Sequence, residues 1–149
     1  MEYSFQIRNA VSSDAEALGQ LSCDNLDLPW SAGDFLQAIE NALAEVVVAE
    51  DDSGLCGYVV LYHAADEGEV PSVAVATRAR RHGIGKAMMQ QAFEQAIGHG
   101  VAKVFLEVRA GNVPALALYE SLGFLQVHVR KNFYTNPTED ACLMMCLIG

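Results

Sequence analysis

The feature of this sequence that most suggests chemistry is a cluster of positive charge in an acidic chain. The chain has nine Lys and Arg residues against nineteen Asp and Glu residues, which gives a formal net charge of −10. Four of the nine cations lie in the stretch RARRHGIGKA at positions 78–87, namely Arg78, Arg80, Arg81 and Lys86. Amides at the start of a helix carry partial positive charge, and glycines let a phosphate approach the backbone. The stretch therefore predicts a phosphate site, and a solvated basic helix start is the alternative.

The elements around this stretch alternate between strand-like and helical patterns. Residue patterns predict strands at 3–8, 45–50, 55–62, 69–75, 101–108, 124–129 and 141–148, and helices at 13–24, 31–41, 85–97 and 114–122. Loops are expected at 63–68 and 130–140. The order predicts an α/β (α+β) fold, in which helices pack on a mixed sheet.

Composition limits the broad class of the protein. A chain of 149 residues that is 52% hydrophobic is expected to form one globular domain over 1–149. The longest apolar runs, VVVA and LMMCLI, are much shorter than the ~20 residues of a membrane-spanning helix. The start, MEYSFQIR, does not resemble a secretion signal, so we expect a soluble cytoplasmic protein.

The cysteines and the net charge narrow the expected ligands and partners. The spacing of Cys23, Cys56, Cys142 and Cys146 matches no zinc pattern, so we expect free thiols and no metal. Phosphate repulsion makes nucleic acid an unfavourable partner for an acidic chain, whereas a basic partner would suit it. We expect a monomer or a weak dimer.

The glycine stretch matches neither common phosphate loop. Its spacing is not that of G-x-x-x-x-G-K-S/T or of G-x-G-x-x-G. The spacing Arg80-x-x-Gly83-x-Gly85 instead resembles the Q/R-x-x-G-x-G/A pyrophosphate loop of the GCN5-related N-acetyltransferases (GNAT). LEVRAGN at 106–112 and ALYESLGF at 117–124 resemble the rest of that family's cofactor core. They are most similar to the RimI type, the bacterial ribosomal-protein-alanine N-acetyltransferases, as are PWS at 29–31, RKNFY at 130–134 and EDA at 139–141.

The resemblance implies a GNAT fold, in which two neighbouring strands splay apart at the acetyl-CoA site and helices cover both faces of the sheet. It implies that the backbone of Val73, Ala74 and Val75 pairs with the pantetheine arm of this cosubstrate. The phosphates would be held by a loop and helix start made of Arg81, His82, Gly83, Ile84, Gly85 and Lys86.

Asn112 corresponds in the resemblance to a cofactor-contacting asparagine, although a residue that caps the following helix is an equally good interpretation. The sequence also departs from the family pattern at Pro71, Ser72 and Ala76. We expect Pro71 to be tolerated because strand pairing is already broken there, whereas the changes at Ser72 and Ala76 leave the cofactor assignment intact but put acceptor preference in doubt.

Acetyl transfer to an amine requires a base for the amine, donors for the oxyanion and a proton for the departing thiolate. Glu107, on the strand face opposite Leu106, fits the base, and the resemblance gives it that role. The alternative is a structural pair with Lys103 or Arg109. Backbone amides near Val75 are the expected oxyanion donors.

Tyr119 is the candidate acid that protonates the thiolate. A tyrosine in an apolar helix is usually a core residue, and the LYESLGF context favours the catalytic interpretation. Trp30 and Tyr134 are weaker candidates for lining the acceptor site. The four histidines show no catalytic pattern.

Three functions remain open at this point. The resemblance favours an acetyltransferase acting on the N-terminal alanine of a small-subunit ribosomal protein, whose basic N-terminal segment would match the acidic chain. An acetyltransferase of small-molecule amines is the alternative, and the segments at 29–31 and 130–134 favour the first. A non-catalytic acyl-CoA-binding module is disfavoured by the presence of both Glu107 and Tyr119.

Overall fold

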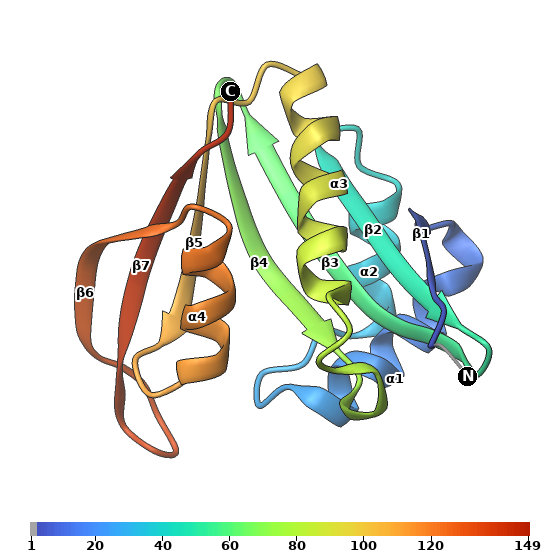
Figure 1. The fold of residues 1–149 in the computed structure, drawn as a ribbon, viewed down its shortest axis with the longest axis horizontal. Coiled ribbons are helices and arrows are strands. Elements are labelled where there is room, and N and C mark those ends of the chain that lie inside the picture. Colours follow the sequence, from blue (N-terminus) through green and yellow to red (C-terminus); the bar gives the residue numbers. More distant parts are fainter. Residues whose placement is uncertain (1–2) are drawn as a thin grey trace.

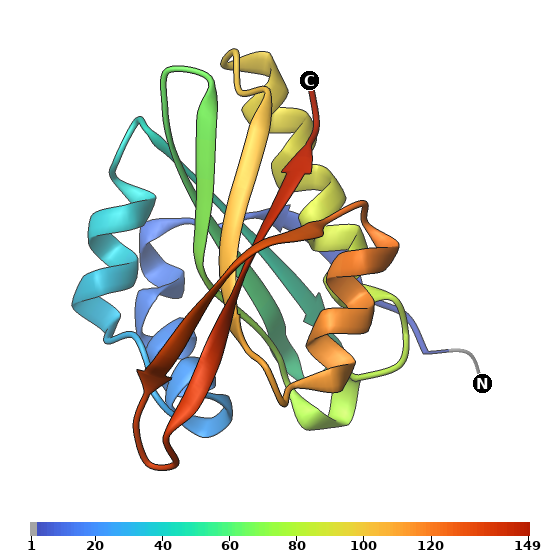
Figure 2. The same ribbon diagram turned by 90° about the vertical axis from the view of Figure 1, so that its left-hand side faces the viewer.

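The computed structural model describes residues 3–149, which form a seven-stranded sheet in the order β1-β2-β3-β4-β5-β7-β6. The strands are β1 (Gln6–Asn9), β2 (Ala44–Asp51), β3 (Gly54–Ala64), β4 (Glu67–Val75), β5 (Lys103–Arg109), β6 (Leu125–Tyr134) and β7 (Glu139–Leu147). The helices are α1 (Ala15–Asn25), α2 (Ala32–Ile39), α3 (Ile84–Gly98) and α4 (Val113–Ser121), with short 3-10 turns at Ser12–Asp14 and Thr77–Ala79. Helices α1 and α2 lie on one face of the sheet, and α3 and α4 lie on the other (Figures 1 and 2). The predicted mixed α/β fold with helices on both faces is confirmed.

Strands β4 and β5 are joined only at one end. They are parallel and pair at three positions, Glu67–Lys103, Gly68–Val104 and Glu69–Phe105, whereas the other strand pairs of the described sheet are antiparallel. Beyond Glu69 the two strands diverge, as Figure 1 shows. Pro71 lies in this unpaired part, so the amide it lacks costs no hydrogen bond to β5. The predicted splay is confirmed.

The core lies between the sheet and its two helical layers, at β2 and β3. Val47, Val48, Val59 and Val60 are fully buried, although neighbours in a strand point to opposite faces. Helices cover both faces of the sheet here, so both sets of side chains are buried and the strands are continuously apolar. A sheet with one solvent-exposed face would have alternating apolar and polar residues instead. On α3, buried residues including Met88 complete the packing.

Two expected loops are largely strand. Strand β3 continues to Ala64 and β4 begins at Glu67, so the expected loop at 63–68 is reduced to a tight turn in which Ala65 has φ of 55°. Strand β6 extends to Tyr134 and β7 begins at Glu139, so the same holds for the expected loop at 130–140. The continuation of β6 from Arg130 to Tyr134 is mostly solvent-exposed, and its sequence lacks the alternation that marks a half-buried strand.

Strand β6 is one edge of the sheet and is unusually apolar for an exposed strand. Leu125, Val127 and Phe133 are 70%, 49% and 48% exposed. The register against β7 shifts twice, between Gln126 and His128 and between Arg130 and Tyr134. Such irregularities twist an edge and make it a poorer template for another strand.

None of the helices within residues 3–149 is both long and apolar enough to cross a membrane.

Candidate active site

Two of the four cations in the basic stretch are used by the protein itself. Arg78 lies 3.0 Å from Asp51 through Nη2 and Oδ1, and the pair lowers the pKa of Asp51 to about 2. Arg80 donates through Nε to the carbonyl oxygen of Val75 at 3.1 Å. These contacts anchor the loop to β4 and to the β2–β3 turn. Arg80, the first residue of the pattern that resembles the pyrophosphate loop, thus holds the loop against the end of β4.

Arg81 and Lys86 are exposed and form no ion pair or side-chain hydrogen bond within residues 3–149. Arg81 has φ of 68°, a conformation that residues other than glycine rarely adopt. His82, between them, stacks on the ring of Tyr3 with centroids 4.1 Å apart. The stretch therefore presents two available cations beside an aromatic stack.

The start of α3 has backbone donors to offer. Its N-cap residue, Gly83, has φ of 78°, and no side chain of the described residues caps the helix. The first amide bonded within the helix is that of Ala87, which donates to the carbonyl of Gly83. The amides before it therefore lack helical acceptors, and their partial positive charge suits an anion.

The two glycines of the stretch have different surroundings. A Cβ built at Gly83 would meet no atom of residues 3–149 within 4 Å, so this backbone is open to a ligand. A Cβ at Gly85 would lie 3.1 Å from Cδ2 of Leu118 and 3.8 Å from Cγ2 of Val75. A side chain at Gly85 would therefore press on Leu118, and glycine lets α3 pack closely against α4 at this point.

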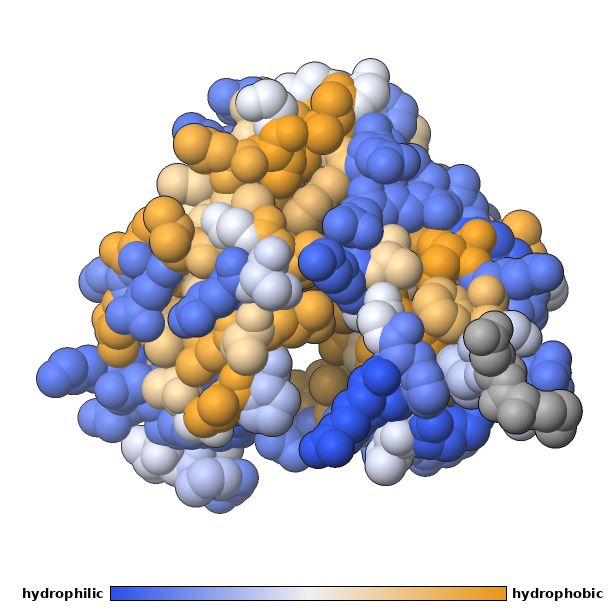
Figure 3. Space-filling model, in the orientation of Figure 1, coloured by the Kyte–Doolittle hydropathy of each residue, from blue (hydrophilic) through white to orange (hydrophobic). Residues whose placement is uncertain are grey.

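The end of β4 has one backbone edge available beside this helix start. Val73, Ala74 and Val75 pair with Val59, Tyr58 and Gly57 of β3, whereas their other side faces the splay. Figure 3 shows an opening between the α3 side and the α4 side of the molecule, below the centre of the view. The helix start, which includes Ile84, lies beside this strand end, since a Cβ built at Gly85 would be 3.8 Å from Cγ2 of Val75.

Glu107 lies in a groove of about 630 Å³ formed by the end of β3, the start of β4, β5 and the β6–β7 hairpin. Its lining includes Tyr62, Glu69, Pro71, Phe105, Glu107 and Tyr134. Atom Oε1 of Glu107 is 3.7 Å from Nη2 of Arg130. Atom Oε2 is buried and has no hydrogen-bond partner within residues 3–149. A buried carboxylate oxygen without a partner is energetically costly, so it marks a place for a water molecule or a substrate.

The partners expected for Glu107 in a structural pair, Lys103 and Arg109, form ion pairs with other carboxylates. Lys103 lies 3.4 Å from Glu67, and Arg109 pairs with Glu139 at 3.3 Å and with Asp27 at 3.5 Å. The cation near Glu107 is Arg130, which the sequence placed in a loop. The pair could not be anticipated because β6 reaches β5 only through the intervening strand β7.

Tyr119 lies on the inner side of α4. It is 7% exposed, and burial raises the pKa of its phenol to about 12, with a further contribution from Tyr134. Its ring packs against Phe124 with centroids 5.8 Å apart, and its hydroxyl makes no hydrogen bond within the described residues. The hydroxyl therefore keeps its proton through the neutral range. Tyr119 does not line the groove that contains Glu107.

The two acceptor-site candidates differ in position. Tyr134 lines the groove, and the guanidinium carbon of Arg109 lies 4.4 Å from the centroid of its ring. Trp30 packs against Phe35 and Tyr62, with centroid distances of 5.3 and 6.4 Å. It does not line the groove itself and supports Tyr62, which does.

Asn112 caps α4, because its Oδ1 accepts a hydrogen bond from the amide of Ala115 at 3.2 Å. The capping interpretation is confirmed, and a contact with a cofactor stays a prediction.

The sequence did not reveal the part that Glu139 plays in the site. Its carboxylate accepts a hydrogen bond from the amide of Gly111 at 2.7 Å and thereby fixes the turn between β5 and α4.

The family can now be decided from comparisons with known proteins. The sequence matches the model of the Acetyltransferase (GNAT) family over residues 9–124. The chain belongs to this family. The splayed strands β4 and β5 and the uncapped start of α3 are consistent with this family of acyltransferases.

Individual relatives agree with the family assignment. The chain is 32% identical over 118 residues to the ribosomal protein bS18-alanine N-acetyltransferase of Escherichia coli K12, covering 78% of this chain and 79% of that one. It is 32% identical to an N-alpha-acetyltransferase of Sulfurisphaera tokodaii, covering 94% and 91%. The crystal structure of the ribosomal-protein-S18-alanine N-acetyltransferase from Escherichia coli superimposes with a TM-score of 0.88 at 28% identity, covering 98% and 95%.

Proposed function

We propose that this GNAT enzyme uses acetyl-CoA to acetylate the α-amine of an N-terminal alanine on a small-subunit ribosomal protein, and that residues 1–149 act as one catalytic domain in the cytoplasm. The observation that carries the chemistry is the buried, unpartnered Oε2 of Glu107 in a groove beside the splayed strands. The acceptor class is taken from the relatives whose names specify bS18 alanine.

The base is needed because an α-amine has a pKa near 8 and cannot attack while protonated. Glu107 Oε2 accepts this proton, directly or through one water, while Arg130 lies beside the other oxygen at 3.7 Å. A carboxylate with one oxygen near a cation and the other free is well arranged for this task.

The cofactor site is supported by unused donors in the chain. The α3 amides, Arg81 and Lys86 suit the phosphates of acetyl-CoA, and the free edge of Val73–Val75 suits its amide-bearing arm. When bound, acetyl-CoA supplies an acetyl thioester as the electrophile. Tyr119, kept protonated by burial, provides the proton that the sulfur needs on leaving.

The acceptor would bind in the groove. Its rim carries the carboxylates of Glu67 and Glu69 in addition to Glu107, and the whole chain has a formal charge of −10. Basic residues that follow the N-terminal alanine would be attracted to this surface.

The function is tested by measuring acetyl-CoA turnover with peptides that begin with Ala, with the same peptides blocked at the α-amine, and with a set of small polyamines. We expect turnover with the free Ala peptides and none with the blocked ones. Faster turnover of the small amines than of the peptides would contradict the proposed acceptor. Lack of turnover with every amine would contradict the catalytic role.

A further inference from the structure

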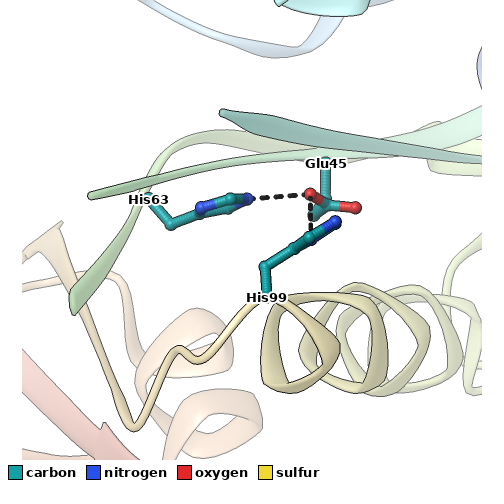
Figure 4. Close-up of side chains that lie close together, drawn as sticks. All are labelled: Glu45, His63 and His99. Atoms are coloured by element: carbon teal, nitrogen blue, oxygen red, sulfur yellow. Dashed lines mark hydrogen bonds and ion pairs between the residues drawn. The ribbon is translucent and has the colours of Figure 1, made fainter. Parts of the chain in front are cut away.

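A second cluster of chemically active side chains lies at the opposite end of α3 from the phosphate site. Glu45 comes from β2, His63 from β3 and His99 is the C-cap residue of α3. Figure 4 shows the three side chains pointing toward one another. A helix of 15 residues is about 22 Å long, so this cluster is separate from the phosphate site, although His63 also belongs to the lining of the groove that contains Glu107.

We propose that Glu45, His63 and His99 bind one Zn²⁺ ion. Their ligand atoms all lie within 4.8 Å of one another. Oε2 of Glu45 is 2.9 Å from Nε2 of His63 and 3.3 Å from Nδ1 of His99. Bonds of about 2.0–2.1 Å in a tetrahedral zinc site put neighbouring ligand atoms about 3.3 Å apart. The two distances from Glu45 are within a few tenths of an ångström of this value, and the two histidine nitrogens, which lie within 4.8 Å of each other, would close around the ion.

The surroundings favour a cation over other occupants. The Glu45 and His63 side chains are only 10% and 5% exposed, so they form the buried side of the site. His99 is 54% exposed and lies on the side of the site that is open to solvent. Two histidines and one carboxylate are a common zinc set, which leaves a fourth position for water. The site lies at the C-terminal end of α3, where the helix dipole also favours positive charge.

The two imidazoles are arranged as a pair of ligands. Their rings are nearly parallel, with an interplanar angle of 19° and centroids 5.2 Å apart, and each directs one nitrogen at the same oxygen of Glu45. Two charged rings stacked in this way would repel each other. A bound metal keeps both rings neutral, because a ligating nitrogen must be unprotonated.

The consequence of binding would be a clamp between three elements. Zinc would tie the start of β2 and the end of β3 to the end of α3, the helix whose other end faces the phosphates. Sequence spacing does not reveal the site, since its ligands come from three separate elements and match no short zinc motif.

The test uses untagged protein that carries Cys23→Ser, because Cys23 is an exposed thiol that could bind zinc by itself. Metal-free protein is titrated with Zn²⁺ against a chromophoric chelator, and with Co²⁺ to record its visible absorption. We expect one ion per chain, Co²⁺ bands typical of four-coordinate nitrogen and oxygen ligation, and a Tm increase of about 5–10 °C at a hundredfold excess of zinc over Kd.

Matched variants locate the site. His99→Ala should weaken zinc binding by at least about tenfold, since even residues that only support a ligand are worth that much. His99 is half-exposed, so circular dichroism should show a folded variant. His128→Ala, which removes an exposed histidine from β6, should bind zinc as the parent does. Lack of binding by the parent, or equal affinity in the parent and His99→Ala, would overturn the proposal. Acetyl transfer is measured in parallel, and the proposal does not depend on it.

Discussion

The splay divides the molecule into two parts that are built differently. The larger part, β1 to β4 with α1 to α3, has a completed core, in which α3 alone contributes seven buried residues. The smaller part, β5 to β7 with α4, is less well buried. Helix α4 contributes one buried residue, Tyr119, and most of β6 is exposed. The strands of the two parts pair at only three positions of β4 and β5, and side-chain packing such as that of Phe124 against Phe93 of α3 completes the junction.

This difference indicates where binding energy can be gained. A ligand between α3 and α4 would cover the half-buried residues of α4, among them Ala115, Leu116 and Leu118, which the protein alone leaves partly exposed. The larger part has helices on both faces of its strands, and the smaller part carries Glu107 and Tyr119, the two residues proposed to act in catalysis. Matched substitutions can separate residues that bind the ligand or react with it from neighbours that only stabilise the fold.

The largest effect is expected for Glu107→Gln. The amide retains the shape of the carboxylate but cannot accept the proton, so turnover should fall by ~10²–10⁴-fold. Raising the pH should partly restore the rate, because more amine is then already deprotonated. The measurement is the pH–rate profile with one Ala peptide. Glu67→Gln is the matched control at the rim of the groove, where its exposed carboxylate pairs with Lys103, and it should have only a small effect. Equal losses in both variants would remove the role of base from Glu107.

Tyr119→Phe should slow turnover by about 10²-fold, with no rescue at high pH, because the missing proton is required by the leaving sulfur. The free energy of unfolding should hardly change, since the hydroxyl makes no hydrogen bond within the described residues. In the parent enzyme, loss of this proton should not limit the rate until the pH approaches about 12, the pKa to which burial raises the phenol. A variant with the parent's rate would show that Tyr119 is a core residue.

Arg81→Ala and Lys86→Ala should each weaken acetyl-CoA binding by roughly tenfold, which corresponds to the loss of one charge-assisted hydrogen bond. In the parent, acetyl-CoA at about 100 times its Kd should raise Tm by roughly 5–10 °C. Arg78→Ala is the contrasting change, because Arg78 is paired with Asp51. It should lower the Tm of the free protein and leave the ligand-induced shift intact. Thermal melts with and without acetyl-CoA distinguish the two patterns, and an unchanged affinity in both Arg81→Ala and Lys86→Ala would move the phosphates elsewhere.

The smallest effect is expected for acceptor charge. Ala peptides with basic residues at the following positions should react a few-fold faster than neutral ones at low salt, and the advantage should shrink as salt screens exposed charges beyond about 8–10 Å. Initial rates over a salt series measure this. An advantage for acidic peptides would contradict a role for the acidic groove rim.

The sequence predicted features that are local along the chain. The spacing Arg80-x-x-Gly83 and the pattern of α3 lie within one continuous stretch, so the helix start and its available amides could be anticipated. The length of β6 could not, because an exposed edge strand need not alternate. The sequence also could not show which cations of the basic stretch are available to a ligand, since Arg78 pairs with Asp51 from a turn that is distant in sequence. The same applies to Arg130 beside Glu107, a pairing that depends on how β6 and β7 are placed against β5.

The exposed β6 edge has a consequence for the behaviour of the protein in solution. This edge strand has an exposed apolar surface formed by Leu125, Val127 and Phe133. Its outer side also carries unpaired backbone groups that could pair with another strand. At neutral pH the net charge of −10 keeps two such edges apart by repulsion. The repulsion disappears as the pH falls toward the isoelectric point of about 4.6. Colloidal stability of this enzyme therefore depends on its acidity, and mild acid should precipitate it through β6 before the fold itself is lost.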